Sequence, residues 1–361
     1  MTVRRRDLDE DDVRIRPGKN KARARTKIRP SYDDARQGMV IAVDRGRFTV
    51  RLVQPTGGGS GRDLFAVKAR ELGRKGIVVG DDVELVGDLA GGDDALARII
   101  RRRPRRTTLR RSADDSDIDE RIIVANADQL GIVVATANPE PRPRLIDRTL
   151  VAAYDGGLRP LLIFTKVDLA DPHELVERYR PLGTAFVVTH KDGDLTELVG
   201  HLQHRLTVLI GHSGVGKSTL VNELVPDAAR VIGSVNAVTG RGRHTSTSAV
   251  ALPLQAGGWV IDTPGIRSFG LAHVDIDRFM HAFPDLEAGV SDCPRGCSHD
   301  NAYCALDAYV AAGRADPARL QSLRMLLASR LGSDDTLVAD DIGGPSSTHP
   351  PQRDRGWTGG G

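Results

Sequence analysis

The sequence has few cysteines, few aromatic residues and no long apolar run. Its 361 residues include three cysteines, and Phe, Trp and Tyr together make up 4% of the chain. Three thiols, all between residues 293 and 304, argue against a disulfide-stabilised fold. No apolar stretch approaches the roughly 18 residues of a membrane-spanning helix, and the N-terminus is basic and then acidic, without the apolar core of a signal peptide. We therefore expect a cytoplasmic protein with no membrane partner.

Charge is distributed unevenly along the chain. The formal net charge is +3, but residues 1–111 hold 28 basic against 16 acidic side chains, and the remainder holds 23 against 32. Residues 14–29 contain eight basic residues and no acidic ones. Residues 98–111 contain eight arginines, again without an acidic residue, and we place this second cluster on a linker. Both clusters predict contacts with a polyanion such as RNA; a solvated tail is the alternative for the first.

Five segments differ in composition. We divide the chain into a basic flexible arm (1–35), a β-barrel (36–105), an α/β domain (112–272), a cysteine-containing helical module (273–331) and a disordered tail (332–361). Short β-branched strand patterns separated by turn residues are typical of a small barrel such as an OB-fold. Near-continuous apolar strands that alternate with amphipathic helices predict a parallel sheet covered on both faces.

A phosphate-binding motif stands in the middle of the α/β domain. Residues 209–218 read LIGHSGVGKS, an apolar strand that runs into the pattern G-x-x-x-x-G-K-S. Backbone N–H groups of such a loop surround the β-phosphate, and the following helix adds the positive potential of its N-terminus. Lys217 would reach the β- and γ-phosphates, and the Ser218 hydroxyl would bind Mg²⁺. The nucleotide-binding residues predicted here are Gly211, His212, Ser213, Gly214, Val215, Gly216, Lys217, Ser218 and Thr219.

Two shorter motifs complete a nucleotide site. WVIDTPG (259–265) is a strand that ends in Asp262, placed to hold Mg²⁺ through water, with the Gly265 N–H available to the γ-phosphate. In FTKVDL, Asp168 would read guanine by accepting hydrogen bonds from N1–H and the exocyclic amine. The stem of Lys166 would lie along the base. GTPases usually carry Asn where this chain has Thr165, so that supporting contact is altered.

The motifs occur in an unusual order, because the base-reading motif precedes the phosphate loop. A cyclic permutation of a GTPase domain explains this order, since the termini of a compact domain tend to lie near each other. The chain resembles the ribosome small-subunit-dependent GTPases of the RsgA family, which combine an OB-like barrel, a circularly permuted GTPase domain and a C-terminal zinc module. The most specific parts are GHSGVGKSTLVN, TGRGRHTST and DTPGIRSFGL, in that order after TKVD.

The resemblance implies further site residues. The segment 240–247 matches the first switch, in which Thr245 or Thr247 would close on Mg²⁺ and the γ-phosphate; we assign Thr245. The residue after DTPG is Ile266, so the Gln that orients water in many GTPases is absent, and His244 would place the water instead. The predicted catalytic residues are therefore His244, Lys217 and Thr245. The predicted magnesium ligands are Ser218, Thr245 and Asp262.

The cysteines lie in a pattern that suits a metal. Cys293, Cys297, His299 and Cys304 put three thiols and an imidazole within twelve residues, as in a tetrahedral structural zinc site. The family pattern is one residue longer in each of its two outer gaps. Reduced cysteines without a metal are the alternative.

The function implied by the resemblance is a GTPase that is activated by the small (30S) ribosomal subunit and acts in its late maturation. It would bind rRNA, hydrolyse GTP to GDP and phosphate with Mg²⁺, carry one structural Zn²⁺ and act as a monomer. Two alternatives are a P-loop ATPase or kinase, and an RNA-binding assembly module in which the nucleotide is only a conformational switch. Guanine preference excludes the first, and a requirement for Lys217 in subunit maturation excludes the second.

Overall fold

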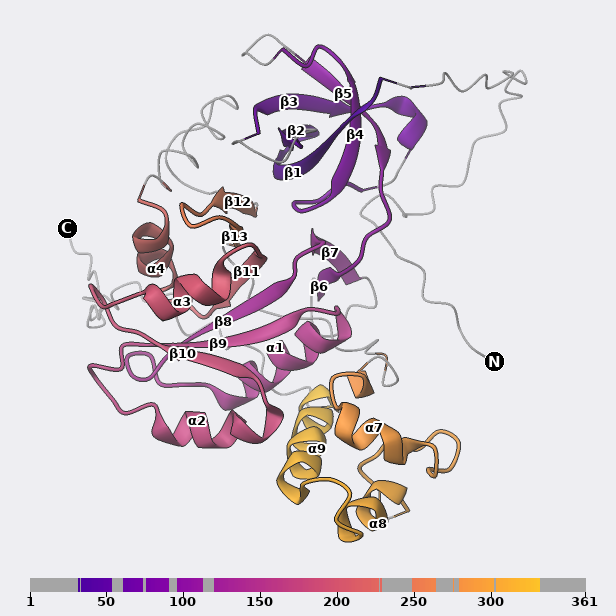
Figure 1. Ribbon diagram of the computed structural model, residues 1–361, viewed down its shortest axis with the longest axis vertical. Helices are drawn as coiled ribbons and strands as arrows, with labels where there is room; N and C mark the ends of the chain where they lie inside the picture. Colours follow the sequence, from indigo (N-terminus) through magenta and orange to yellow (C-terminus); the bar gives the residue numbers. More distant parts are fainter. Residues whose placement is uncertain are drawn as a thin grey trace, which may run out of the picture.

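The computed structural model describes residues 32, 34–53, 61–73, 76–90, 96–112, 120–226, 228, 249–263, 275, 279–301 and 303–331. Within these residues a barrel, an α/β domain and a helical module follow one another along the chain (Figure 1). The predicted basic arm, apart from residues 32, 34 and 35, and the predicted tail lie outside them.

The first domain is a closed five-stranded barrel. Its strands are β1 (Arg36–Asp44), β2 (Arg47–Leu52), β3 (Asp63–Lys68), β4 (Asp82–Gly87) and β5 (Leu96–Arg102), with a short 3₁₀ turn η1 (Arg70–Leu72). They pair in the order β1-β2-β3-β5-β4, and β4 returns to β1. The β3–β5 pair is parallel and the other pairs are antiparallel. Alternate residues fill the interior, which confirms the OB-like barrel expected from the strand patterns.

The second arginine cluster is not the linker that we expected from its composition. Arg98, Arg101 and Arg102 belong to β5, and Arg110 and Arg111 belong to β6 (Thr108–Ser112). The period of two explains β5, because its alternate residues, Ala97 and Ile99, are buried and leave an arginine between them exposed. Strand β6 pairs with β7 (Glu120–Ala125) in a separate two-stranded ribbon.

The α/β domain is built on a six-stranded part of the main sheet. Its strands are β8 (Gln129–Ala135), β9 (Arg159–Thr165), β10 (Ala185–Val188), β11 (Leu206–Gly211), β12 (Val250–Pro253) and β13 (Trp259–Asp262). They lie in the order β10-β9-β8-β11-β13-β12, and only β12 is antiparallel to its neighbour in this part of the sheet. The strand that precedes the phosphate loop, β11, thus lies in the middle, although β8, β9 and β10 precede it in the chain.

Helices cover both faces of this sheet. They are α1 (Pro143–Asp155) and α2 (His173–Tyr179) on one face, with the 3₁₀ turn η2 (Arg180–Leu182), and α3 (Thr196–Leu202) and α4 (Lys217–Leu224) on the other. Along β8, Leu130 and Ile132 join the first core and Val133 joins the second, as the alternation of a strand requires. Because α1 and α4 lie on opposite faces, the carboxyl ends of β8 and β11 flank the crevice in which such sheets bind ligands.

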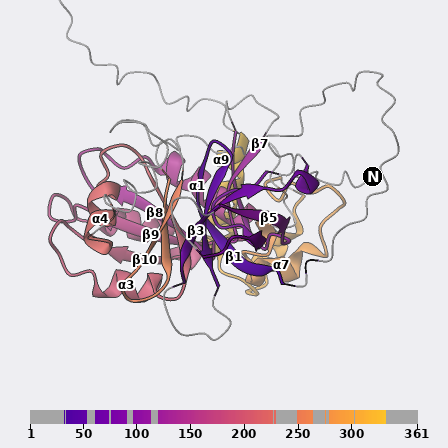
Figure 2. The ribbon, with the colours of Figure 1, turned by 90° about the horizontal axis from the view of Figure 1, so that it is seen from above.

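The C-terminal module contains α7 (Pro284–Val290), α8 (Ala305–Ala311) and α9 (Pro317–Leu331). It shares the core of the α1 face: the Tyr154 ring meets the rings of Phe279 and Phe283 edge to face, with centroids 5.8 and 5.9 Å apart. In both views α3 and α4 lie on the side of the molecule away from α7 (Figure 1, Figure 2). None of the described helices is long and apolar enough to cross a membrane.

Candidate functional site

The phosphate loop runs from the end of β11 at Gly211 to the start of α4 at Lys217. Gly214 and Gly216 have φ angles of 80° and 92°, which side chains with a Cβ rarely adopt. A Cβ on Gly211 would lie 2.7 Å from the Val133 carbonyl oxygen, so the loop begins tightly against β8. These glycines therefore hold the loop in the curved conformation that the motif predicts.

Lys217, at the start of α4, meets Asp262 at the end of β13, the strand that runs parallel to β11. The Lys217 Nζ forms an ion pair with the Asp262 carboxylate, and it also lies 3.4 Å from the Thr263 carbonyl oxygen. Both side chains are largely buried, with 14% and 17% exposed. Thr263 is held in turn, because its hydroxyl donates to the Leu209 carbonyl at 2.8 Å. The structure thus brings Asp262 and Thr263, the first two residues of DTPG, to the phosphate loop, as the strand pattern predicts.

The residues present at this edge fit a magnesium ion. Ser218, next to Lys217 at the start of α4, offers a hydroxyl, and Asp262 offers a carboxylate. Oxygen ligands of this kind are what Mg²⁺ prefers, and it usually keeps several waters and takes its remaining ligands from a phosphate substrate.

The predicted base-reading motif TKVD forms hydrogen bonds with the backbone of the phosphate loop. Thr165 is the buried last residue of β9, and its hydroxyl donates to the Val215 carbonyl at 2.6 Å. The Lys166 Nζ donates to the Gly214 carbonyl at 2.8 Å and to the Asn138 carbonyl. Two consecutive side chains of TKVD therefore bond to the backbone of the loop, so the altered residue Thr165 has a defined structural contact.

A cavity of about 140 Å³ opens beside these residues. It is lined by Thr165, Lys166, Thr189, His190, Lys191, Gly216, Thr219, Leu220 and Glu223. Asp168 is exposed and is not among the residues that line it. Our sequence reasoning did not single out the segment 189–191, although it directly follows β10. The rule that functional residues follow the carboxyl ends of parallel strands would have found it.

We expect the Thr165→Val variant to be less stable and to bind GTP more weakly. The change keeps the shape of the side chain but leaves the Val215 carbonyl without its donor, which costs about 1–3 kcal/mol. Thermal unfolding and titration with GTP would measure both effects. Thr165→Ser keeps the hydroxyl and is the matched control. Equal stability and equal GTP affinity of the Val variant would contradict a role of this hydrogen bond.

Part of the predicted site lies outside the described residues. This holds for His244, Thr245 and the alternative Thr247, and for Gly265. Their roles stay predictions.

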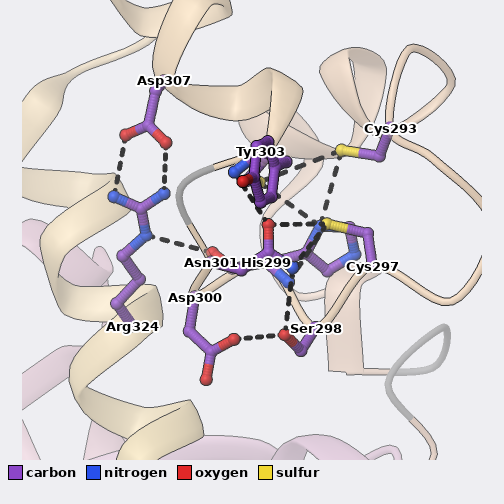
Figure 3. A network of polar contacts seen from close by, with 10 residues as sticks. Cys293, Cys297, Ser298, His299, Asp300, Asn301, Tyr303, Asp307 and Arg324 are labelled. Carbon is purple, nitrogen blue, oxygen red and sulfur yellow. Dashed lines mark hydrogen bonds and ion pairs between the residues drawn. The ribbon is translucent and has the colours of Figure 1, made fainter.

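The four predicted zinc ligands converge in the C-terminal module. Figure 3 shows three of them, Cys293, Cys297 and His299, close together. The atoms they offer, from Cys293, Cys297, His299 and Cys304, all lie within 4.8 Å of one another. The Cys293 sulfur is 3.7 Å from the His299 Nδ1 and 3.9 Å from the Cys304 sulfur. Two sulfurs bound to a tetrahedral zinc at about 2.3 Å lie about 3.8 Å apart, so the donor set and its spacing fit Zn²⁺.

Burial favours the protonated form of the Cys304 thiol when no cation compensates. It raises the pKa of Cys304 to about 11, and the neighbouring Cys293 adds to the shift. A bound dication would favour the thiolates. The backbone N–H of His299 donates to the Cys297 sulfur at 3.4 Å, an interaction that strengthens as the sulfur becomes anionic.

Arg324 connects the ligand loop to two helices (Figure 3). From α9 its Nε donates to the His299 carbonyl at 3.0 Å, and its two terminal nitrogens donate to the Asp307 carboxylate of α8 at 2.8 and 2.7 Å. Hydrogen bonding to Arg324 lowers the pKa of Asp307, and the same pairing raises the pKa of Arg324. The backbone of the histidine ligand is thus fixed by a charged pair.

Comparisons with known proteins agree with this architecture. The sequence model of the family described as RsgA GTPase matches residues 102–272. The crystal structure of YjeQ from Thermotoga maritima has a TM-score of 0.59 and 26% identity, covering 82% of this chain and 99% of that chain. The crystal structure of YloQ, described as a circularly permuted GTPase, also has a TM-score of 0.59, with 23% identity over 82% of this chain and 95% of that chain, and it supports the fold.

Curated relatives are more similar in sequence. A Pseudomonas putida protein named small ribosomal subunit biogenesis GTPase RsgA is 40% identical over 248 residues, which are 66% of this chain and 71% of the relative. A protein of the same name from Pseudomonas fluorescens is 38% identical over 266 residues, 70% of this chain and 75% of the relative. This chain therefore belongs to the RsgA GTPase family.

Proposed function

We propose that this protein hydrolyses GTP to GDP and phosphate, that the small (30S) ribosomal subunit activates it, and that it acts in late maturation of that subunit. One observation carries the proposal. The base-side motif, the phosphate loop and Asp262 meet at one edge of a permuted sheet, and a barrel with arginines on its surface precedes that sheet. The names of the Pseudomonas relatives support the choice of subunit. We further propose that it acts in the cytoplasm as a monomer.

The nucleotide chemistry follows from the residues at this edge. The phosphate loop, Gly211 to Thr219, would donate backbone N–H groups to the phosphates, and Lys217 would move from Asp262 to the β- and γ-phosphates. Asp168 would read guanine once the base lies beside Lys166. Bound Mg²⁺, held by Ser218 and by Asp262 through water, would neutralise charge on the phosphate oxygens.

The first switch would complete the reaction. We assign Thr245 to the magnesium ion and the Gly265 N–H to the γ-phosphate, and His244 to positioning of the attacking water for in-line displacement. Weak hydrolysis without a partner follows, because Ile266 stands where many GTPases carry the water-orienting Gln. Binding to the subunit would increase the rate of this reaction.

Basic side chains on the barrel would contact rRNA. Arg36, Arg47 and Arg98 are exposed on three different strands. Arginine contacts to phosphates give strong, salt-dependent attraction that needs no base sequence. We propose Zn²⁺ as the ion of the cysteine cluster, one per chain with a structural role, because three sulfurs and one imidazole nitrogen are a typical closed zinc set.

The decisive experiment is steady-state GTP hydrolysis with and without purified small subunits. Large subunits, ATP in place of GTP, and Lys217→Ala are the controls. We expect a large increase that needs both GTP and small subunits. Bound GTP without any increase would refute the partner, and equal use of ATP would refute the guanine-specific reading.

We expect His244→Ala to lose most of the stimulated turnover while it keeps its affinity for GTP. A residue that positions water acts in the transition state, so kcat falls and nucleotide binding does not. Single-turnover hydrolysis and titration with a non-hydrolysable GTP analogue separate these effects. His281→Ala changes an exposed histidine that pairs with Glu287 and belongs to none of the nucleotide motifs, and it is the control. Equal losses of turnover and affinity would contradict the assignment.

A further inference from the structure

The barrel is joined to the α/β sheet at one particular hairpin. Strands β12 and β13 form this hairpin, which follows the first-switch segment in sequence and ends at Asp262. Barrel strand β1 pairs with β12 at Ala42 and Val250, so that barrel and domain share one 11-stranded sheet. Ala42, Val250 and Val260 also belong to one buried core. The barrel therefore packs directly on the two strands that lie between the first-switch segment and DTPG.

A charged stack forms a second contact with the same hairpin. The guanidinium carbon of Arg51, on β2, lies 4.8 Å from the centre of the Trp259 ring. Trp259 is the first residue of β13, three positions before Asp262. Arg51 also pairs with Asp63 on β3, so both residues belong to the barrel. The Arg51 Nη2 donates to the Asp63 carboxylate at 2.8 Å. Because the Arg51 side chain is only 19% exposed, its attraction to the indole face is weakly screened by water.

A second set of contacts, mostly buried, also holds the barrel. Asp81 and Arg105 form an ion pair with 0% and 5% of their side chains exposed. The Asn126 amide donates to the Gly80 carbonyl at 2.9 Å, and a Cβ on Gly80 would lie 1.9 Å from a neighbouring carbonyl oxygen. With these contacts in place, a displacement of the β12–β13 hairpin relative to the barrel must change the contact with Trp259.

We infer that Arg51 is a positioning residue for GTP hydrolysis, acting through Trp259 on the strand that presents Asp262 to the phosphate loop. RNA bound to the barrel stabilises one arrangement of β1 and β2. Because Arg51 on β2 contacts Trp259 on β13, this arrangement also fixes the position of β13. The inference rests on the proposed function, because the occupant of the barrel is the rRNA of the small subunit. A coupling of this kind requires both partners of the stack and changes turnover more than affinity.

Kinetics of matched variants test the coupling. Arg51→Lys keeps the charge next to Asp63 but loses the planar group that stacks, and Trp259→Leu removes the ring. We expect each to lower subunit-stimulated kcat about five- to tenfold, with the KM for GTP and the affinity for the subunit unchanged, and the double variant to lose no more than Trp259→Leu. Arg314→Lys is the control, because the Arg314 guanidinium lies 5.6 Å from the centre of the Tyr309 ring, a contact of the same kind in the C-terminal module.

A fluorescence measurement tests the same contact without subunits. The chain has two tryptophans, so Trp357→Phe leaves Trp259 as the emitting residue. We expect its emission to differ between GDP and a non-hydrolysable GTP analogue, and Arg51→Lys in this background to reduce that difference.

The outcomes separate the inference from the proposed function. Unchanged stimulated kcat in Arg51→Lys, together with an unchanged emission difference, would overturn the inference. So would a loss that lies entirely in subunit affinity, which would make Arg51 a phosphate contact. If subunits fail to stimulate the unaltered protein, the proposed function fails. The emission difference alone then decides whether the Arg51–Trp259 contact changes between the GDP-bound and GTP-bound states.

Discussion

Lys217→Ala should reduce GTP hydrolysis at least about 100-fold, with or without small subunits. Lys217 is the cation at the start of α4, and its Nζ pairs with Asp262 beside the phosphate loop. Removal of one preorganised group that stabilises transition-state charge typically costs about 10²- to 10³-fold in kcat. The affinity for GTP should fall as well, because the ground state also carries charge on the β- and γ-phosphates.

Single-turnover hydrolysis at saturating GTP would measure the first effect, and titration with GDP and a GTP analogue would measure the second. Lys191→Ala is the matched control, because Lys191 lines the neighbouring cavity on the side of TKVD and is not part of the phosphate loop. Its kcat should stay within about threefold of the unaltered protein, since Lys191 lies outside the phosphate loop that stabilises transition-state charge. A Lys217→Ala protein that is folded and turns over at the normal rate would refute the assignment of the loop.

The sequence predicted the elements whose patterns are local. The apolar strands β8, β9 and β11, and the helices 143–155 and 196–202, follow from periodicity alone. The phosphate loop was found because its glycines and Lys217 have fixed spacing. The cysteine cluster was found in the same way, since all four ligands lie within twelve residues.

Features that depend on partners distant in sequence were harder to predict. Composition alone assigns the arginines of β5 to a linker. The alternation of buried and exposed residues in this strand is hard to recognise, because three of its seven residues are arginines and one buried residue is as small as Ala97. The segment 189–191 carries no motif and acquires its place in the cavity only when β10 pairs with β9. The sequence also predicted no contact for Phe283, although this side chain joins the C-terminal module to Tyr154 of α1.

Because of that shared core, loss of the proposed zinc ion should destabilise more than residues 293–304. Cys304 is 4% exposed and lies in the same buried cluster as Leu320 of α9 and Leu150 of α1. Structural zinc contributes folding free energy directly, since the ligands converge only in the folded state. Chelation should therefore lower Tm by about 10 °C or more, given roughly 2–4 °C per kcal/mol for a domain of this size. Because α9 packs on α1, part of this loss should appear in the unfolding of the α/β domain.

Cysteine substitutions separate loss of the metal from loss of packing. Cys297 is half-buried, whereas Cys304 is buried, so the two thiols differ in packing, although both are proposed ligands of the same ion. If the metal provides the stability, Cys297→Ser and Cys304→Ser should lower Tm by similar amounts and should both reduce the zinc content below one per chain. Tyr303→Ala alters a side chain of the same loop that is 85% exposed, and it should leave both quantities unchanged. A large effect of Cys304→Ser alone, with full zinc in both variants, would show that the thiol acts through packing and that the cluster is not a structural metal site.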